Sequence, residues 1–329
     1  MSRPLRIFVA APPPVFGHAG ATWALLHYRI GLSRLGHKVR MGGPQEFDGL
    51  KFDIVVNTSG LLDPERIAAI PIRVYLDLDP AFNQLWHEQG VDRRFDGHTH
   101  FVTVGQAIGS RTCEVPTHGL DWIGILPPVV MDEWPPSDQV VTRAFTTVAN
   151  LRSYGPIERM GVLFGQKVHS LRAFRNLPLL ANERFLIAMR LHPEESEDVT
   201  ALITGGWEFA DPDMVAATPR AYRQFVRGSL AEIGIAKSGY VVSRCGWFSD
   251  RSACYLASGR PVIAQETGFS QFLPTGRGLL GFADVDSAVH AVANVCDNYG
   301  AHSRAARRLA EEYLDSDRVL SNLLEKVCA

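Results

Sequence analysis

The run Ser249-Asp250-Arg251-Ser252 gathers four polar side chains within about one turn of a predicted helix. Serine and aspartate are favoured at helix N-caps, and a helix start presents free backbone N–H groups and the positive end of the helix dipole. An anion suits that position, and the Arg251 guanidinium can pair its N–H donors with phosphate oxygens. The run therefore predicts a phosphate-binding helix start. Simple capping by Ser249 and Asp250, with a solvated Arg251, explains the same residues.

The neighbouring segments are expected to place this helix in a βαβ unit. Tyr240 to Val242 is predicted as a strand, and the helix should begin at Ser249 or Asp250 and stop at Gly259. Pro261 to Ala264 is predicted as the following strand. In such units the helix N-terminus lies at the carboxyl ends of the strands, where anionic ligands bind.

Short apolar strands alternate with helices along the rest of the chain, which is typical of parallel, doubly wound sheets. A helix is predicted over residues 22–35, with Gly36 ending it. The predicted strands are residues 5–10, 37–41, 53–57, 72–76, 101–104 and 122–126 in the first half, and 145–149 and 185–189 in the second.

Prolines at 127–128 and 135–136 indicate a linker between two domains. We expect an α/β fold with a Rossmann-like domain over residues 1–130 and a linker over 131–142. A second Rossmann-like domain is expected over 143–302, followed by helices over 303–329 that are able to pack back on the first domain.

Composition narrows the function. The chain has 329 residues, of which 46% are hydrophobic, so it can form two cores. Its net charge of −2 argues against a nucleic-acid partner. The first apolar run is short and followed by prolines, so we expect no membrane span and a cytoplasmic location. The five cysteines include no C-x-x-C pair, which argues against a zinc or redox site.

Two parallel α/β domains favour nucleotide binding, but two common nucleotide motifs are missing. After the first predicted strand the chain reads Ala10-Ala11-Pro12-Pro13-Pro14 instead of G-x-G-x-x-G. The P-loop pattern G-x-x-x-x-G-K-[ST] does not occur in the sequence. The sequence therefore argues against a dinucleotide dehydrogenase and a P-loop enzyme.

Three stretches together resemble the GT-B glycosyltransferases. They are Gly17-His18 with Gly36-His37-Lys38-Val39, similar to the opening of UDP-glycosyltransferases; Gly246-Trp247 with Ser249, Gly259 and Pro261, similar to their donor-site stretch; and Thr267-Gly268-Phe269 with Gly278-Leu279-Leu280 and Asp284, similar to the related retaining enzymes. The resemblance implies two Rossmann-like domains facing a cleft. It also implies transfer of a sugar from a nucleoside-diphosphate sugar to a hydroxyl-bearing small molecule or glycan.

The chain departs from that pattern at three positions. Retaining members have two glutamates around the donor loop, and counting from Gly259 places Gly246 and Cys254 at those positions. Arg244-Cys245 stand where a histidine usually precedes Gly-Gly-Trp. The anomeric outcome therefore stays open. A second hypothesis follows, namely a nucleotide-sugar binding module that has lost catalysis.

The helix start and the resemblance together predict a donor site. Its residues are Arg152, Lys167, Gly246, Ser249, Asp250, Arg251, Ser252, Thr267, Gly268 and Phe269. Arg152 and Lys167 are included by analogy with basic residues that face donor phosphates in GT-B enzymes, and each is otherwise an ordinary surface charge. No cofactor is expected, because the nucleotide sugar is a co-substrate.

Catalysis requires a group that removes the proton of the acceptor hydroxyl. A histidine with a near-neutral pKa, held by a carboxylate, suits this role. His18 follows the first strand and is the predicted base, with Asp79 as its catalytic partner, and Gly17 and Asp77 are predicted to bind the acceptor. A loop histidine that only bonds backbone groups is an equal alternative for His18.

Asp77-x-Asp79 supports one more alternative. Two carboxylates in this spacing after a strand resemble the D-x-D site of GT-A glycosyltransferases, where a divalent cation bridges the donor phosphates. That alternative implies one nucleotide-binding domain and loss of activity with a chelator. The two predicted domains favour metal-independent transfer.

Overall fold

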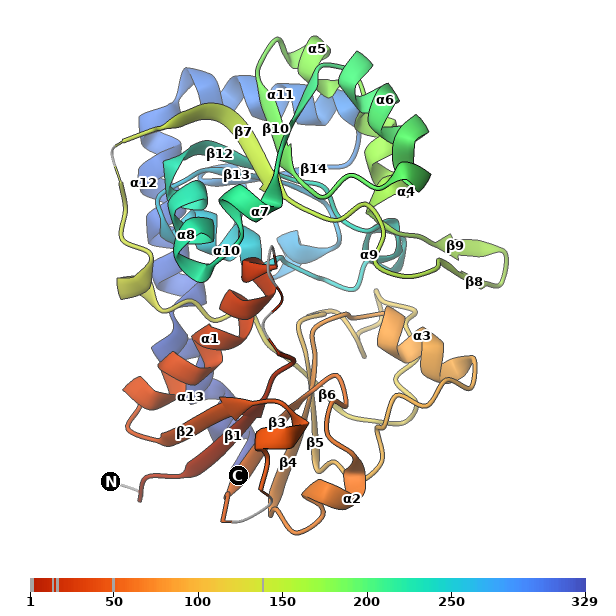
Figure 1. Cartoon of the computed structure of the whole chain (residues 1–329), viewed down its shortest axis with the longest axis vertical. Helices are drawn as coiled ribbons and strands as arrows, with labels where there is room; N and C mark the ends of the chain where they lie inside the picture. Colours follow the sequence, from red (N-terminus) through yellow and green to blue (C-terminus); the bar gives the residue numbers. More distant parts are fainter. Residues whose placement is uncertain (1–2, 14, 16–17, 49–50, 138) are drawn as a thin grey trace.

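The computed structural model describes residues 3–13, 15, 18–48, 51–137 and 139–329. It contains two six-stranded parallel sheets flanked by helices, one sheet in each half of the chain (Figure 1). The predicted fold class, two Rossmann-like doubly wound domains, is confirmed.

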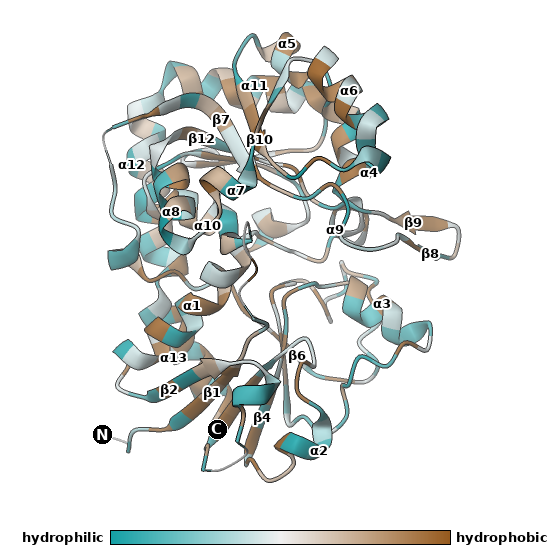
Figure 2. Cartoon of the chain, in the orientation of Figure 1, coloured by the Kyte–Doolittle hydropathy of each residue, from teal (hydrophilic) through white to brown (hydrophobic). Residues whose placement is uncertain are grey.

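The first sheet has the strand order β2-β1-β3-β4-β5-β6. Its central strands are apolar runs buried on both faces, as β1 and β3 show, and Figure 2 shows hydrophobic colour along β1. The strands are β1 (Arg6–Ala10), β2 (Lys38–Gly42), β3 (Ile54–Thr58), β4 (Ile72–Asp77), β5 (His100–Thr103) and β6 (Trp122–Gly124). The helices are α1 (Ala19–Arg34), α2 (Pro64–Ile67) and α3 (Phe82–Glu88), with a 3₁₀ turn, η1 (Pro44–Glu46).

The second sheet has the order β11-β10-β7-β12-β13-β14, which is the 3-2-1-4-5-6 order of a Rossmann domain. Its strands are β7 (Thr142–Val148), β10 (Phe185–Ala188), β11 (Trp207–Ala210), β12 (Ser229–Gly234), β13 (Val262–Gln265) and β14 (Leu279–Phe282). A separate hairpin, β8 (Ile157–Arg159) with β9 (Val162–Phe164), projects beside α9 (Ser238–Ser243) (Figure 1).

The helices of the second half are α4 (Lys167–Leu171), α5 (Leu177–Ala181), α6 (Ser196–Thr204), α7 (Pro212–Val215), α8 (Pro219–Gly228), α9 (Ser238–Ser243), α10 (Asp250–Ala257), α11 (Val285–Asp297), α12 (Tyr299–Leu309) and α13 (Ser316–Val327). The 3₁₀ turns are η2 (Met131–Glu133), η3 (Arg172–Phe174), η4 (Pro193–Glu195) and η5 (Phe269–Gln271), and η6 (Ala310–Leu314) is a π-helical turn. The predicted helix start is confirmed, because Ser249 is the N-cap of α10 and its hydroxyl accepts a bond from the Arg251 N–H at 3.2 Å.

The strand predicted at Tyr240–Val242 is wrong, because these residues belong to α9. Tyr240 is buried and Val242 is 45% exposed, which is the one-sided burial of a short surface helix. The strand that precedes α10 in the sheet is β12, whose apolar run contains the fully buried Glu232. Because Glu232 interrupts the apolar residues of this segment, a search for apolar runs does not predict the strand.

The end of the chain returns to the first domain. Helix α13 packs against α1, and Val319, Leu320 and Leu323 share a core with Ile7 of β1 (Figure 1). The contact is close at Gly31, where an added Cβ would meet a Leu320 methyl at 2.6 Å.

The segment predicted as a linker is packed into the protein. Trp134 is fully buried, with its ring 5.1 Å from that of Trp23 on α1. The Val129 N–H also donates to the carbonyl of Leu314 at 2.7 Å, beside the returning end of the chain. The connection between the sheets is therefore held by side-chain packing and backbone bonds.

None of the helices in the described part of the chain combines the length and the apolar character needed to cross a bilayer.

Candidate functional site

A cleft of about 400 Å³ lies between the two sheets. Residues at or just beyond the carboxyl ends of strands line it from both sides: Pro12 after β1 and Thr58 at the end of β3, then Val148 at the end of β7 and Ala188 at the end of β10. Strand order reverses between β1 and β3 and between β7 and β12. Doubly wound sheets bind ligands outside the strand ends at such reversals. Both domains thus present their expected binding edge to one cleft.

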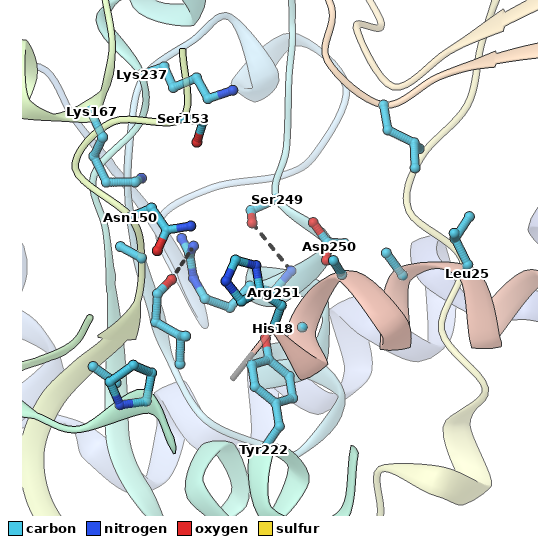
Figure 3. A pocket seen from close by; sticks show the side chains of 18 of the residues that line it. His18, Leu25, Asn150, Ser153, Lys167, Tyr222, Lys237, Ser249, Asp250 and Arg251 are labelled. Atoms are coloured by element: carbon cyan, nitrogen blue, oxygen red, sulfur yellow. Dashed lines mark hydrogen bonds between the residues drawn. The ribbon is translucent and has the colours of Figure 1, made fainter. Parts of the chain in front are cut away.

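Two helices begin at this cleft. Ser249, Asp250 and Arg251 of α10 line it, as do His18 and Gly20 at the start of α1 (Figure 3). The first turn of α1 contains no acidic side chain. The positive ends of two helix dipoles therefore meet in the cleft, and this favours a negatively charged ligand.

Arg251 is fixed at the end of β7. Its Nη1 donates to the Val148 carbonyl at 3.1 Å, and its Nε donates to the carboxylate of Glu232, which is fully buried. Burial by itself lowers the pKa of Arg251, but the charges of Glu232, Tyr222 and Asp250 and the hydrogen bond to Glu232 together outweigh burial and raise the pKa. The guanidinium is thus a permanently charged group whose orientation is set by two partners.

Lys167 lies at the neighbouring strand end. Its Nζ donates to the carbonyl of Ile235, just beyond β12, and the side chain lines the cleft (Figure 3). Burial, then the charges of Arg251 and Lys237, hold the pKa of Lys167 well below the usual value for lysine. Lys167 and Arg251 therefore flank the point between β7 and β12 where strand order reverses.

Asp79 joins the two domains instead of contacting His18. Its carboxylate accepts hydrogen bonds from Lys237 Nζ at 3.0 and 3.1 Å, from the Tyr154 hydroxyl at 2.5 Å and from the Tyr240 hydroxyl. All three donors belong to the second domain, and Asp79 follows β4 of the first. We call Asp79, Lys237, Tyr154 and Tyr240 the interdomain cluster. Among the described residues, no hydrogen bond joins His18 and Asp79, and His18 lines the cleft as an exposed residue.

Asp77 is fully buried below the cleft. Its oxygens accept bonds from the side chains of Asn83 at 2.5 Å, Gln84 at 2.9 Å and Thr103 at 2.8 Å, and from the Asp79 N–H at 2.9 Å. Burial raises the pKa of Asp77, and these bonds oppose the rise. Asp77 thus organises the loop after β4, and its oxygens are occupied by protein donors.

Six predicted donor residues lie outside the cleft lining. They are Arg152, Gly246, Ser252, Thr267, Gly268 and Phe269. Arg152 pairs with Glu195 at 3.5 Å and Asp198 at 3.2 Å and lines a neighbouring pocket of about 450 Å³. Of the other five, Ser252 belongs to α10 and Gly246 to the loop before it, whereas Thr267, Gly268 and Phe269 lie in the loop after β13 and the start of η5. The predicted acceptor residue Gly17 lies outside the described residues.

Gly246 and Thr267 hold the loop before α10. The Gly246 N–H donates to the Thr267 carbonyl at 2.8 Å, and the Thr267 hydroxyl donates to the Trp247 carbonyl at 2.5 Å. Gly246 has φ +75°, and an added Cβ would meet the backbone nitrogen of Ala107 in the first domain at 2.8 Å. The glycine permits close approach of the two domains.

Ser252 and Phe269 are buried, and Phe269 packs with Phe248 at 5.5 Å between ring centroids. The N–H of Gly268 donates to Glu266 at 3.3 Å. These three residues help to hold the loop before α10 in place.

Sequence reasoning missed several residues of the site. Lys237, Tyr240, Tyr222 and Asn150 all line the cleft. Lys237 directly follows the apolar run of β12, so recognising that strand would have placed this lysine at its carboxyl end. The buried charge at Glu232 was a second signal, because a charged residue inside an apolar strand requires a partner.

In the described ranges no three His, Cys, Asp or Glu side chains are grouped so as to hold a metal ion.

The chain is similar to solved glycosyltransferase structures along its whole length. An alpha-glucosyltransferase in complex with UDP-glucose and DNA matches with TM-score 0.67 and 10% identity over 99% of this chain and 100% of that one. A glycosyltransferase from Rickettsia africae matches with TM-score 0.62 and 12% identity over 99% and 98%. HepE from Anabaena, in complex with UDP-glucose, matches with TM-score 0.60 and 11% identity over 98% and 99%.

No family model and no curated protein matches the sequence. At these identities the similarity establishes the two-domain GT-B fold.

Proposed function

We propose that this chain is a glycosyltransferase that moves a sugar from a nucleoside-diphosphate sugar to a hydroxyl-bearing acceptor. The observation that carries the proposal is the cleft itself, where Arg251, Lys167 and two helix N-termini converge at the strand-order reversals of two Rossmann-like sheets. A diphosphate is the anion that matches this charge. The solved structures with the same fold include complexes with UDP and UDP-glucose, which supports a uridine nucleotide as the first one to test.

The proposed donor site consists of Ser249, Arg251 and Lys167 together with Lys237. Arg251 supplies a fixed cation, Lys167 supplies an ammonium that a bound phosphate would stabilise, and the start of α10 supplies backbone donors. The acceptor is proposed to enter on the side of the first domain, past His18. His18 is the proposed base in that position, because its side chain lines the cleft and makes no hydrogen bond or ion pair with another side chain among the described residues.

The proposed reaction needs no metal and no cofactor besides the nucleotide sugar as co-substrate. The cations in the cleft can neutralise the diphosphate as a divalent ion would. The proposed acceptor is a small molecule or a glycan, with no nucleic acid, and the proposed location is the cytoplasm.

The test is a panel of UDP-, GDP-, TDP- and ADP-sugars. Thermal stabilisation of the protein identifies the nucleotide, and release of the nucleoside diphosphate with an acceptor mixture measures transfer. We expect stabilisation and turnover by one nucleotide class, unchanged by a chelator. Stabilisation without turnover would support a binding module, and loss of turnover with chelator would contradict metal independence. Neither stabilisation nor turnover with any sugar nucleotide would refute the proposal.

A further inference from the structure

Asp250 is the one acidic residue, of those that the structure describes, that lines the cleft. The charged groups around the same cavity are the cations Lys167, Lys237 and Arg251. Figure 3 shows Asp250 next to Ser249 and beside α1, with Lys167 and Lys237 on the other side of the cavity. Helices α1 and α10 contact each other, so Asp250 lies where the two domains meet.

No side chain in the described part of the protein donates a hydrogen bond to the Asp250 carboxylate. The groups that stabilise its charge are Arg251 and the backbone N–H groups of residues 250 and 251, while burial raises its pKa. Because Asp250 lines the cavity, its oxygens keep acceptor capacity for a ligand bound there. A carboxylate there repels a diphosphate, so the complementary ligand group is a hydrogen-bond donor.

Two other carboxylates near the cleft are already occupied. Asp79 accepts bonds from Lys237, Tyr154 and Tyr240, as described above. Glu232 is fully buried beneath the cavity and holds Arg251. Asp250 is therefore the carboxylate placed to contact a ligand.

We propose that Asp250 accepts a hydrogen bond from a hydroxyl group of the transferred sugar and selects donors that carry a hydroxyl at that position. The proposal rests on the proposed function. In a nucleoside-diphosphate sugar the sugar is bonded directly to the phosphate that the start of α10 would hold, so its hydroxyls come within reach of the first residue of that helix. A site that hydrogen-bonds a substrate hydroxyl discriminates strongly against the analogue that lacks it.

The first experiment separates the sugar from the nucleotide. The sugar nucleotide identified by the panel and its free nucleoside diphosphate are titrated calorimetrically into wild type, Asp250→Ala and Asp250→Asn. We expect Asp250→Ala to weaken sugar-nucleotide binding by about 10- to 150-fold, the effect of losing a hydrogen bond to a charged group. Binding of the free diphosphate should stay equal or become tighter, because a negative charge is removed. Asp250→Asn should lie between, because its amide oxygen still accepts a bond.

The second experiment identifies the hydroxyl with monodeoxy analogues of the same donor sugar. One analogue should bind wild type weakly and show no further loss with Asp250→Ala, which is the coupling expected of a direct contact. Asp284→Ala is the matched control, because Asp284 is also a carboxylate at a helix start, where it accepts a bond from the Ser287 N–H, and it is not among the residues that line the cleft. It should leave both affinities unchanged, and thermal melting checks that each variant is folded.

The proposal is overturned if Asp250→Ala weakens the free diphosphate as much as the sugar nucleotide, or weakens neither. It is also overturned if only the KM for acceptor changes, since that result would place Asp250 on the acceptor. Failure of the proposed function is a separate result, because wild-type protein would then bind and turn over no sugar nucleotide.

Discussion

Arg251 at the cleft has two electrostatic roles, one in ligand binding and one in stability. Arg251 provides a cation for an anionic ligand, yet the same guanidinium neutralises the fully buried Glu232. A substitution of Arg251 therefore changes folding as well as binding. The two effects can be separated because the partner carboxylate is known.

We predict that Arg251→Met lowers the free energy of unfolding by about 3 to 5 kcal/mol, because it leaves a buried carboxylate unpaired. The double variant Arg251→Met with Glu232→Gln should recover most of that loss, and its affinity for the nucleoside diphosphate should still be reduced. Urea denaturation measures the first effect and calorimetry the second. Arg184→Met is the control, since Arg184 pairs with Glu208 on the surface and should cost less than about 1 kcal/mol. An Arg251→Met variant as stable as wild type contradicts the prediction.

Lys167 should make nucleotide binding depend on pH. Its pKa is lowered in the free protein, and a bound diphosphate stabilises the ammonium and raises that pKa again. Affinity should therefore be highest where free Lys167 is protonated, and should fall as pH rises above its lowered pKa toward the usual lysine pKa of about 10.5.

Titration calorimetry with the nucleoside diphosphate over this pH range measures the slope. Lys167→Gln should weaken binding at pH 7 and reduce the slope of affinity against pH. The pH dependence that remains in this variant is expected to come from Lys237, because burial lowers its pKa too. Lys38→Gln, an exposed change on β2, should leave the slope as in wild type. An equal slope in Lys167→Gln would show that this lysine is not the group responsible.

At the scale of elements, α1 and α10 meet through a buried histidine. His27 Nδ1 accepts a bond from the Val130 N–H at 3.1 Å, and Nε2 faces the Cys254 sulfur at 3.6 Å. Burial lowers the pKa of His27 to about 3. The neutral ring is thus part of the contact between a helix of each domain.

This histidine predicts a loss of stability in acid. Below its unfolded pKa of about 6.5 the unfolded chain binds a proton that folded His27 does not, so stability falls as pH drops from 6.5 toward 3, by up to about 1.4 kcal/mol per pH unit. Carboxylates add their own effect, so the informative quantity is the difference between wild type and His27→Gln in urea melts at several pH values. That difference should shrink as pH falls, whereas exposed His192→Gln should follow wild type. Parallel curves for wild type and His27→Gln would contradict the assignment.

The β8–β9 hairpin makes a second contact between the two domains, on the same side of the cleft as the interdomain cluster. Arg159 of the hairpin pairs with both oxygens of Glu88 on α3 of the first domain, at 2.7 and 3.0 Å. Together with Asp79 and Lys237, this pair ties the two domains where no chain connection crosses (Figure 1).

We predict that Asp79→Asn lets the domains separate more often, because Lys237 and two tyrosine hydroxyls lose a charged acceptor. Small-angle scattering should show a larger radius of gyration, and a larger one still in Asp79→Asn with Glu88→Gln. Glu208→Gln removes an ion pair within one domain and should leave the radius unchanged. An unchanged radius in the double variant would mean that packing elsewhere holds the domains together.

At the scale of the whole molecule, the sequence predicted what depends on neighbours along the chain. Most strands, the Ser249 cap and the glycine stop at Gly259 follow from local rules, and all are present. The contact of Asp79 with Lys237 joins residues 158 positions apart. It depends on how two domains face each other, which no local pattern specifies.

The same limit explains the incorrect strand at Tyr240–Val242. Tyr240, Val241 and Val242 are strand-forming residue types and predict the strand before α10 in the βαβ unit. The strand at that place is β12, whose apolar run is interrupted by Glu232. The charged residue is tolerated there because Arg251 lies opposite it in space. Only the folded arrangement reveals that compensation.

The return of α13 to the first domain also constrains how the protein is made. Val319, Leu320, Leu323 and Val327 complete the core beside β1 and α1, yet they are translated about three hundred residues after those elements. During synthesis the second domain can form its sheet while one side of the first domain still lacks its covering helix. The first domain to leave the ribosome is thus the last to close its core, and its apolar face stays uncovered until the end of the chain has been made.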